Sequence, residues 1–125
     1  MEQLLIVGSI YNLSFAIFHL FFWKIFKWKT QLAKLDFINR AIMQVLNLCL
    51  IFCFLMFSYI SFFHTSKLLT TRLGHSLMAG ISIFWAFRAI QQIVFFKLKH
   101  WGSILFLLVF ICGAIIYAIP VFKLL

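Results

Sequence analysis

A single arginine inside a long apolar run is the residue of this sequence best suited to bind a ligand. Arg88 lies near the middle of Leu77–Phe96, and the only acids, Glu2 and Asp36, fall outside the apolar runs. A guanidinium binds phosphate, carboxylate or halide through charge-assisted hydrogen bonds. An arginine in hydrocarbon costs between about 3 and more than about 10 kcal/mol. Arg88 is therefore predicted to be solvated by amide side chains, backbone carbonyls, water or an anion from outside.

Three of the apolar runs carry polar residues at helical spacing and at similar depth. Residues three, four or seven positions apart share one face of a helix. His19, Asn47 and Gln92 each lie about five residues, roughly 8 Å, to one side of the centre of their run. Polar residues in membrane helices usually face the bundle interior or a wet cavity. The sequence therefore predicts one anion-attracting, cytoplasm-facing cavity with eight ligand-binding residues: Arg88, Arg40, Gln44, Asn47, Gln92, His19, Asn12 and Trp85.

A structural interpretation of the same residues stands beside this one. Asn and Gln side chains often do no more than cross-link membrane helices, with about 0.5–2 kcal/mol per hydrogen bond. Arg40 lies close enough to the end of its run to extend into the headgroup layer. Arg88 lies too deep for that, and a charge at mid-depth is by default a functional hypothesis.

The composition defines the class of protein that must position these residues. Of 125 residues, 66% are hydrophobic and 10% are charged, and the mean hydropathy is +1.12. A globule of 14.7 kDa cannot bury so much apolar surface. This excludes a soluble enzyme, a nucleic-acid-binding domain and a disordered tail. The expected fold is an all-α integral membrane protein with four transmembrane helices in an antiparallel up-down bundle.

Residues 1–125 are predicted to form one transmembrane domain with no linker. A hydrocarbon layer of about 30 Å requires about 20 apolar residues per helix. Asp36 is a plausible N-cap for the second span. Backbone groups in lipid must bond within their own segment, which requires helices for runs of this length. The four predicted spans are Leu4–Trp23, Ala41–Phe63, Leu77–Phe96 and Trp101–Val121.

The third and fourth predicted helices should lie next to each other. Only residues 97–100 connect them, so the two helices must be adjacent and antiparallel. Small residues four positions apart allow helices to approach closely. Such pairs occur at Ser82 and Ala86 and at Ala114 and Ala118, and we expect them to make contacts within the bundle.

The basic residues predict the orientation in the membrane and the nature of the polyanion that they meet. The net charge is +9, and the Lys and Arg residues lie mainly between apolar runs, as in other membrane proteins. The segment 24–40 holds five of them and the segment 97–100 holds two, whereas 64–76 holds two and Lys123 follows the last run. The positive-inside rule places 24–40 and 97–100 in the cytoplasm and both termini outside, in a bacterial-type inner (plasma) membrane. The expected partner is the phospholipid headgroup layer, not nucleic acid.

The histidines and cysteines allow one cofactor hypothesis. Paired axial imidazoles on facing helices would bind haem b, but His64, His75 and His100 fall at helix ends, where histidine is ordinarily an interfacial residue. No metal site is expected, because carboxylate and thiolate ligands are missing near the histidines. Three cysteines inside apolar runs are expected to be reduced packing residues: Cys49, Cys53 and Cys112.

The leading functional interpretation is binding or translocation of an anionic solute or lipid headgroup through the predicted cavity, in a homo-oligomer or a larger membrane complex. One alternative is a non-catalytic accessory subunit in which Arg88 pairs with a carboxylate of another membrane protein. A second alternative is a small haem b-binding redox protein. An enzyme is not expected, since no nucleophile lies beside a base, although His19 and Arg88 leave acid/base chemistry on a lipid open.

Overall fold

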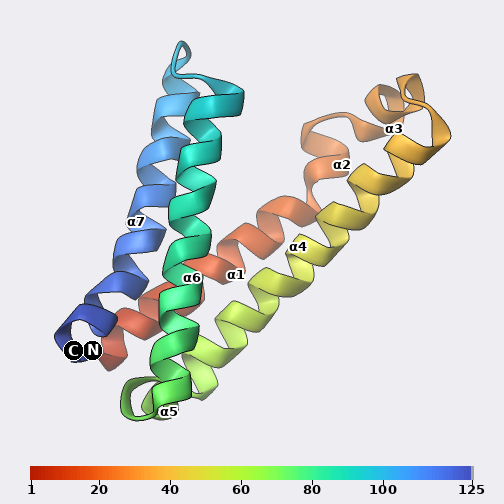
Figure 1. The fold of residues 1–125 in the computed structure, drawn as a ribbon. Coiled ribbons are helices and arrows are strands. Elements are labelled where there is room, and N and C mark those ends of the chain that lie inside the picture. The colour runs from red at the N-terminus through yellow and green to blue at the C-terminus, as the bar shows by residue number, and fades with distance from the viewer. Residues whose placement is uncertain (125) are drawn as a thin grey trace. The chain divides into compact units, whose positions relative to one another are not determined.

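The computed structural model describes residues 1–124, which form four long helices and several short ones (Figure 1). The long helices are α1 (Glu2–Leu20), α4 (Phe37–Phe63), α6 (Arg72–Gln91) and α7 (Trp101–Leu124). A π-helical turn, η2 (Gln92–Phe96), extends α6. The short elements are α2 (Phe22–Ile25), α3 (Trp28–Gln31), the 3₁₀ turn η1 (Leu32–Lys34) and α5 (Thr65–Thr70).

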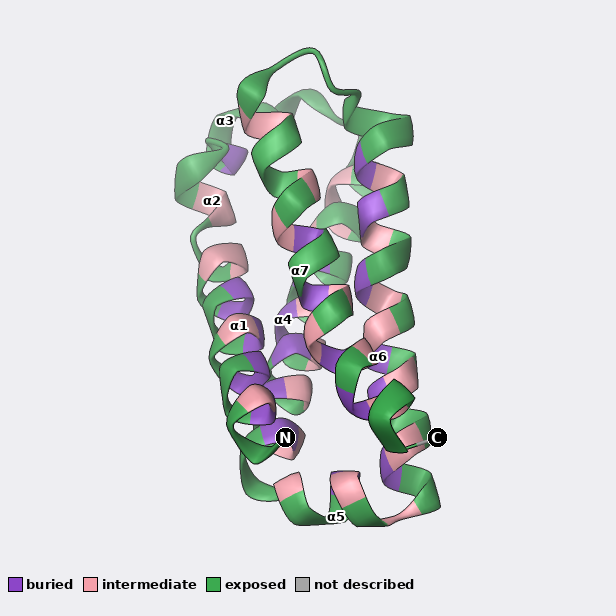
Figure 2. Cartoon of the chain, turned by 90° about the vertical axis from the view of Figure 1, so that its left-hand side faces the viewer, coloured by how far each residue is buried: buried purple, intermediate pink, exposed green. Residues whose placement is uncertain are grey.

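The surface of the long helices is that of a membrane protein. Each of the four is long and apolar enough to cross a bilayer, and only 22–33% of its most apolar 18-residue stretch is buried. Large apolar side chains such as Ile10, Phe52, Ile83 and Leu108 are more than half exposed. Figure 2 shows exposed residues along all four long helices. A helix with apolar side chains exposed in this way is stable in lipid rather than water, so the predicted all-α integral membrane class is confirmed.

The chain divides into two compact units. One comprises Ser9–Ile60, with most of α1 and α4; the other comprises Met1–Gly8 and the described residues from Ser61 onward, with α6 and α7. In the first unit, hydrogen bonds join Ser9 to Ser58 and His19 to Asn47. As the residue number rises in α1 it falls in α4, so these two helices are antiparallel.

In the second unit α6 and α7 lie side by side and antiparallel (Figure 1). The Ser82 hydroxyl donates to the Ala114 carbonyl at 2.7 Å, across the small-residue positions of both helices. The prediction that these two helices are adjacent and in contact at small residues is confirmed. About one turn further along α7, the buried Tyr117 hydroxyl is 2.6 Å from the Ser61 hydroxyl.

Three of the long helices, counting η2 with α6, contain their predicted spans and extend beyond them, whereas α1 ends before its predicted limit. The structure ends α1 at Leu20, not Trp23, and starts α4 at Phe37, not Ala41. It also starts α6 at Arg72 and continues α7 past Val121 to Leu124. Side chains cap the first turns of two of these helices, α4 and α6. Hydropathy alone does not predict such caps. The predicted N-cap Asp36 accepts from the Asn39 N–H at 3.2 Å, and the Thr71 hydroxyl accepts from the Gly74 N–H at 3.0 Å.

Replacing Gly74 by alanine should destabilise the α5–α6 corner. A Cβ at this position would overlap the Leu68 Cα and the Lys67 carbonyl, which are backbone atoms that cannot rotate away. We expect a loss of about 1–3 kcal/mol of stability, as for other overpacked sites. The measurement is thermal unfolding in detergent.

Gly80→Ala in the same helix is the matched control, since a Cβ there meets no heavy atom within 4 Å. Alanine also favours a helix over glycine by about 1 kcal/mol, so this variant should melt at the wild-type temperature or above. Equal melting temperatures for G74A and G80A would contradict the expectation.

Candidate functional site

Asn47 and His19 bind each other through both ends of the Asn47 amide. The Asn47 Nδ2 group donates to the His19 backbone carbonyl at 3.0 Å, and Asn47 Oδ1 lies 2.7 Å from His19 Nδ1. Since the amide oxygen can only accept, Nδ1 of the imidazole carries the hydrogen. The ring also stacks on Phe22, with centroids 4.1 Å apart. The two residues therefore form one rigid pair between α1 and α4.

This pair explains why α1 ends before its apolar run does. Carbonyls in the last turn of a helix lack a partner within the helix, and in lipid no water replaces it. Asn47, which is only 3% exposed, supplies that partner to the carbonyl of His19. The chain then turns at Phe21 and enters α2, which moves Trp23 out of the long helix.

Beyond this turn lies an open groove of about 690 Å³, which we call the basic groove. The Gln44 side chain crosses it: its oxygen accepts from Trp23 Nε1 and its nitrogen donates to the Arg40 carbonyl, both at 3.2 Å. Trp28 is buried and its ring meets the Trp23 ring edge-on at 5.1 Å. The lining residues come from the connection 23–33 and from the first turns of α4: Trp23, Lys24, Trp28, Lys29, Leu32, Ala33, Arg40 and Gln44.

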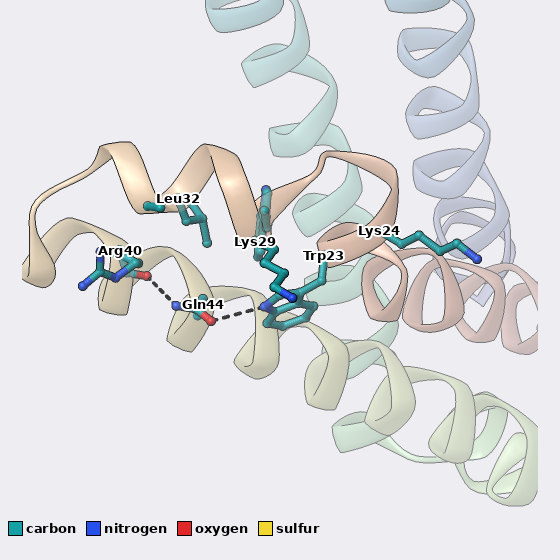
Figure 3. A pocket seen from close by; sticks show the side chains of 8 residues that line it. Trp23, Lys24, Lys29, Leu32, Arg40 and Gln44 are labelled. Carbon is teal, nitrogen blue, oxygen red and sulfur yellow. Dashed lines mark hydrogen bonds between the residues drawn. The ribbon is translucent and has the colours of Figure 1, made fainter.

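The charge of the basic groove is of one sign. Three of its eight residues are cationic and none is acidic. In Figure 3 Lys29 extends toward the Trp23 ring, the Arg40 guanidinium lies at the opposite end of the row Arg40–Gln44–Trp23, and Lys24 extends away. Lys29 and Arg40 thus place a positive charge at each end of this row.

Arg88 lies in the second unit, beside two phenylalanine rings. We call Arg88, Trp85, Phe96 and Phe110 the Arg88 cluster. Its Cζ atom is 4.4 Å from the centroid of Phe110 on α7 and 5.4 Å from that of Phe96 on η2. Trp85, 1% exposed, stacks nearly parallel to Phe110 at 5.9 Å. The Nη1 atom is buried and has no hydrogen-bond partner within residues 1–124. Of the predicted partners, neither an amide nor a carbonyl within residues 1–124 bonds Nη1, so water or an outside anion stays a prediction for this atom.

Gln92 forms its hydrogen bonds with the start of α7. Its Nε2 group donates to the Ser103 hydroxyl at 3.1 Å, and that hydroxyl donates to the Lys97 carbonyl. These bonds join the end of η2 to the start of α7, where α6 has lost its regular pattern of hydrogen bonds. Gln92 therefore stabilises the turn that positions Phe96.

The eight predicted residues divide between the two units. In one, His19 pairs with Asn47, and Arg40 and Gln44 line the basic groove; Asn12 is fully buried in α1 and does not line it. In the other, Trp85, Arg88 and Gln92 lie on consecutive turns of α6 and η2. A single cavity that joins all eight stays a prediction.

Several residues of the two clusters were not predicted as ligands. Lys24, Lys29 and Trp28 belong to the segment 24–40, whose basic residues are expected to meet the phospholipid headgroups. Aromatic and apolar residues alternate with the basic ones there, and this pattern is the signal that could have indicated a groove. Phe96 and Phe110 carried no signal, because they are two of eighteen phenylalanines and their proximity to Arg88 depends on how α6 and α7 pair.

The remaining histidines make local contacts at helix ends. His75 Nε2 lies 3.1 Å from the Leu69 carbonyl, and His100 Nδ1 accepts from the Gly102 N–H at 3.0 Å. His64 is the residue before α5. Over residues 1–124, no three or more His, Cys, Asp or Glu side chains gather as a metal ion would require. The three cysteines are unpaired.

A double-mutant cycle tests the pair that ends α1. We expect His19→Phe and Asn47→Leu to be coupled by about 0.5–2 kcal/mol, the range of hydrogen bonds in membrane proteins. The measurement is unfolding free energy in mixed micelles. Asn39 is exposed and two turns before Asn47, so H19F and N39A should be additive. Additivity of H19F and N47L would contradict the pairing.

Comparison with known proteins gives no match. No protein-family model, no curated protein sequence and no solved structure is significantly similar to this chain. Its function is therefore argued from the chemistry of the basic groove and of the Arg88 cluster.

Proposed function

We propose that this membrane protein binds the phosphate of an anionic lipid headgroup in the basic groove. The observation that carries the proposal is a groove with cations at both ends, an aromatic wall and no acidic lining residue. Arginine binds phosphate oxygens in a bidentate manner, and lysine acts as a point charge. Arg40 and Lys29 supply one of each.

The position of the groove along the helices favours a lipid over a freely diffusing solute. The groove lies where α1 has ended and α4 begins. This is the level at which apolar spans meet the headgroup layer, and Trp and Lys side chains concentrate there in membrane proteins. Phe37 and Ile38, just before Arg40, are 74% and 66% exposed and offer an apolar surface to acyl chains.

The groove is preorganised for binding. Gln44 holds Trp23 through its indole N–H, and Trp28 is buried against the same connection. A wall that is already ordered loses little conformational entropy when a ligand arrives. The groove is open and confined to one end of its unit, so we propose binding and not translocation for this site. Gln44 acts as a positioning residue, because the oxygen and the nitrogen of its side-chain amide are both bonded to the protein.

Removing the cations at the two ends of the groove should weaken selective headgroup binding. Each basic residue near an anionic surface contributes about 1 kcal/mol, so K29Q/R40Q should weaken phosphatidylglycerol binding about 30-fold. Native mass spectrometry of the detergent-solubilised protein, titrated with phosphatidylglycerol or phosphatidylcholine, measures this effect.

K97Q/K99Q removes the same charge from the segment 97–100, outside the groove, and should bind like wild type. An equal loss in both variants would contradict a specific groove. Competition by millimolar inorganic phosphate would identify a soluble phosphate as the ligand. Its failure to compete would identify the lipid.

We further propose that the groove faces the cytoplasm of a bacterial-type cell, with both termini outside. Support comes from the excess of Lys and Arg in the segments 24–40 and 97–100. In a chain with its three cysteines replaced by serine, K34C places a single thiol at an exposed position of the segment 24–40, and S66C places one in the segment 64–76. A membrane-impermeant maleimide should label S66C in intact cells and K34C only after lysis. The reverse pattern would overturn this orientation.

A further inference from the structure

The Arg88 cluster carries a separate inference, because it holds a charged donor that the protein leaves unsatisfied. The guanidinium contacts two ring faces, which attract a cation but accept no conventional hydrogen bond. Nη1 is buried and has no hydrogen-bond partner within residues 1–124. Buried charged groups in proteins are paired or hydrogen-bonded, so this N–H group requires an acceptor from elsewhere.

The two acidic residues do not supply that acceptor. Asp36 caps α4 with its carboxylate, and Glu2 lies in the first turn of α1. Neither forms an ion pair with Arg88, whose buried nitrogen remains orphaned. The site therefore has one uncompensated positive charge, which one negative charge would neutralise.

We propose that Arg88 binds a small monovalent anion of the halide class at Nη1, beside Phe96 and Phe110. A monovalent ion matches the single charge, whereas a phosphate dianion would leave an excess of negative charge in an apolar site. Because the chain's own atoms cover this N–H group, a compact ion reaches it with the smallest displacement of the surrounding side chains. Phenylalanine ring edges carry partial positive charge and tolerate an anion beside them.

The burial of Nη1 favours an ion over the carboxylate of a partner helix. On α6 the exposed Phe87 and Ile90, at 60% and 56%, lie on another face of the helix than Arg88. A second membrane protein that docks on that exposed face would not present a carboxylate to Nη1. A free ion is not tied to a docking face.

The Trp85 ring provides a reporter at this site, because it stacks on the same Phe110 that contacts Arg88. Bromide quenches indole fluorescence on contact or close approach. The experiment is a bromide titration of the full chain in neutral detergent at constant ionic strength, with gluconate as the balancing anion. Tryptophan fluorescence and melting temperature are recorded together.

Wild type should show saturable quenching and a rise in melting temperature with the same midpoint. R88Q should shift that midpoint at least tenfold or lose saturation, while R88K, which keeps the charge, should retain part of the response. R72Q is the matched control, since it is the same substitution at an exposed arginine outside both the basic groove and the Arg88 cluster. It should titrate like wild type, whether or not the basic groove binds a lipid.

A measurement on the unaltered protein does not depend on any variant folding. Crystals grown in bromide should show an anomalous peak within hydrogen-bond reach of Arg88 Nη1. A saturable response that R88Q keeps would overturn the proposal, as would the absence of both saturation and the peak. A carboxylate of a co-purified membrane protein at Nη1 would replace the ion with a subunit interface.

Discussion

Hydrocarbon offers no hydrogen-bond partners, and this constraint organises the structure more than any other. Several polar side chains between the ends of the long helices are bonded inside the protein: Ser82 to a carbonyl of α7, Tyr117 to Ser61, and Asn47 to the ring and the carbonyl of His19 on α1. Each bond joins two different helices or a helix to a connection. Because an unmet polar group in lipid costs several kcal/mol, these contacts also specify which helix faces pair.

The basic groove follows from one of these bonds. Asn47 donates to a carbonyl at the end of α1, and the chain turns at Phe21. After this turn, the Trp23 indole N–H donates to the Gln44 side-chain oxygen. The connection after the turn is then held against α4 and not left free in solvent. The proposed ligand site thus depends on an amide two turns further along α4 than Arg40. In the proposed function, Asn47 and Gln44 are positioning residues, and Arg40 and Lys29 meet the ligand.

Arg88 is the exception to the rule that polar groups are paired. Two aromatic rings attract the guanidinium by about 2 kcal/mol each when desolvated, but they offer Nη1 no hydrogen-bond acceptor, and it has none within residues 1–124. The unsatisfied N–H group is the physical reason to propose a negatively charged ligand. A change in the pairing of η2 with α7 would disrupt this site, because Phe96 lies on η2 and Phe110 lies on α7.

Composition and hydropathy were sufficient to derive the all-α membrane class, the four long helices and the antiparallel pairing of α6 with α7, because these depend on burial energy and on a short connection. The sequence also identified five polar residues in or beside apolar runs that need a bonding partner there: Arg88, Arg40, Gln44, Asn47 and His19. It could not show which of them bind one another. That outcome depends on side-chain geometry across helices, where Asn47 reached the His19 carbonyl and Nη1 of Arg88 reached no acceptor. The tertiary structure alone decided that α1 stops at Leu20 and that phenylalanine rings solvate the buried charge, since aromatic residues so abundant in the chain carry no positional signal.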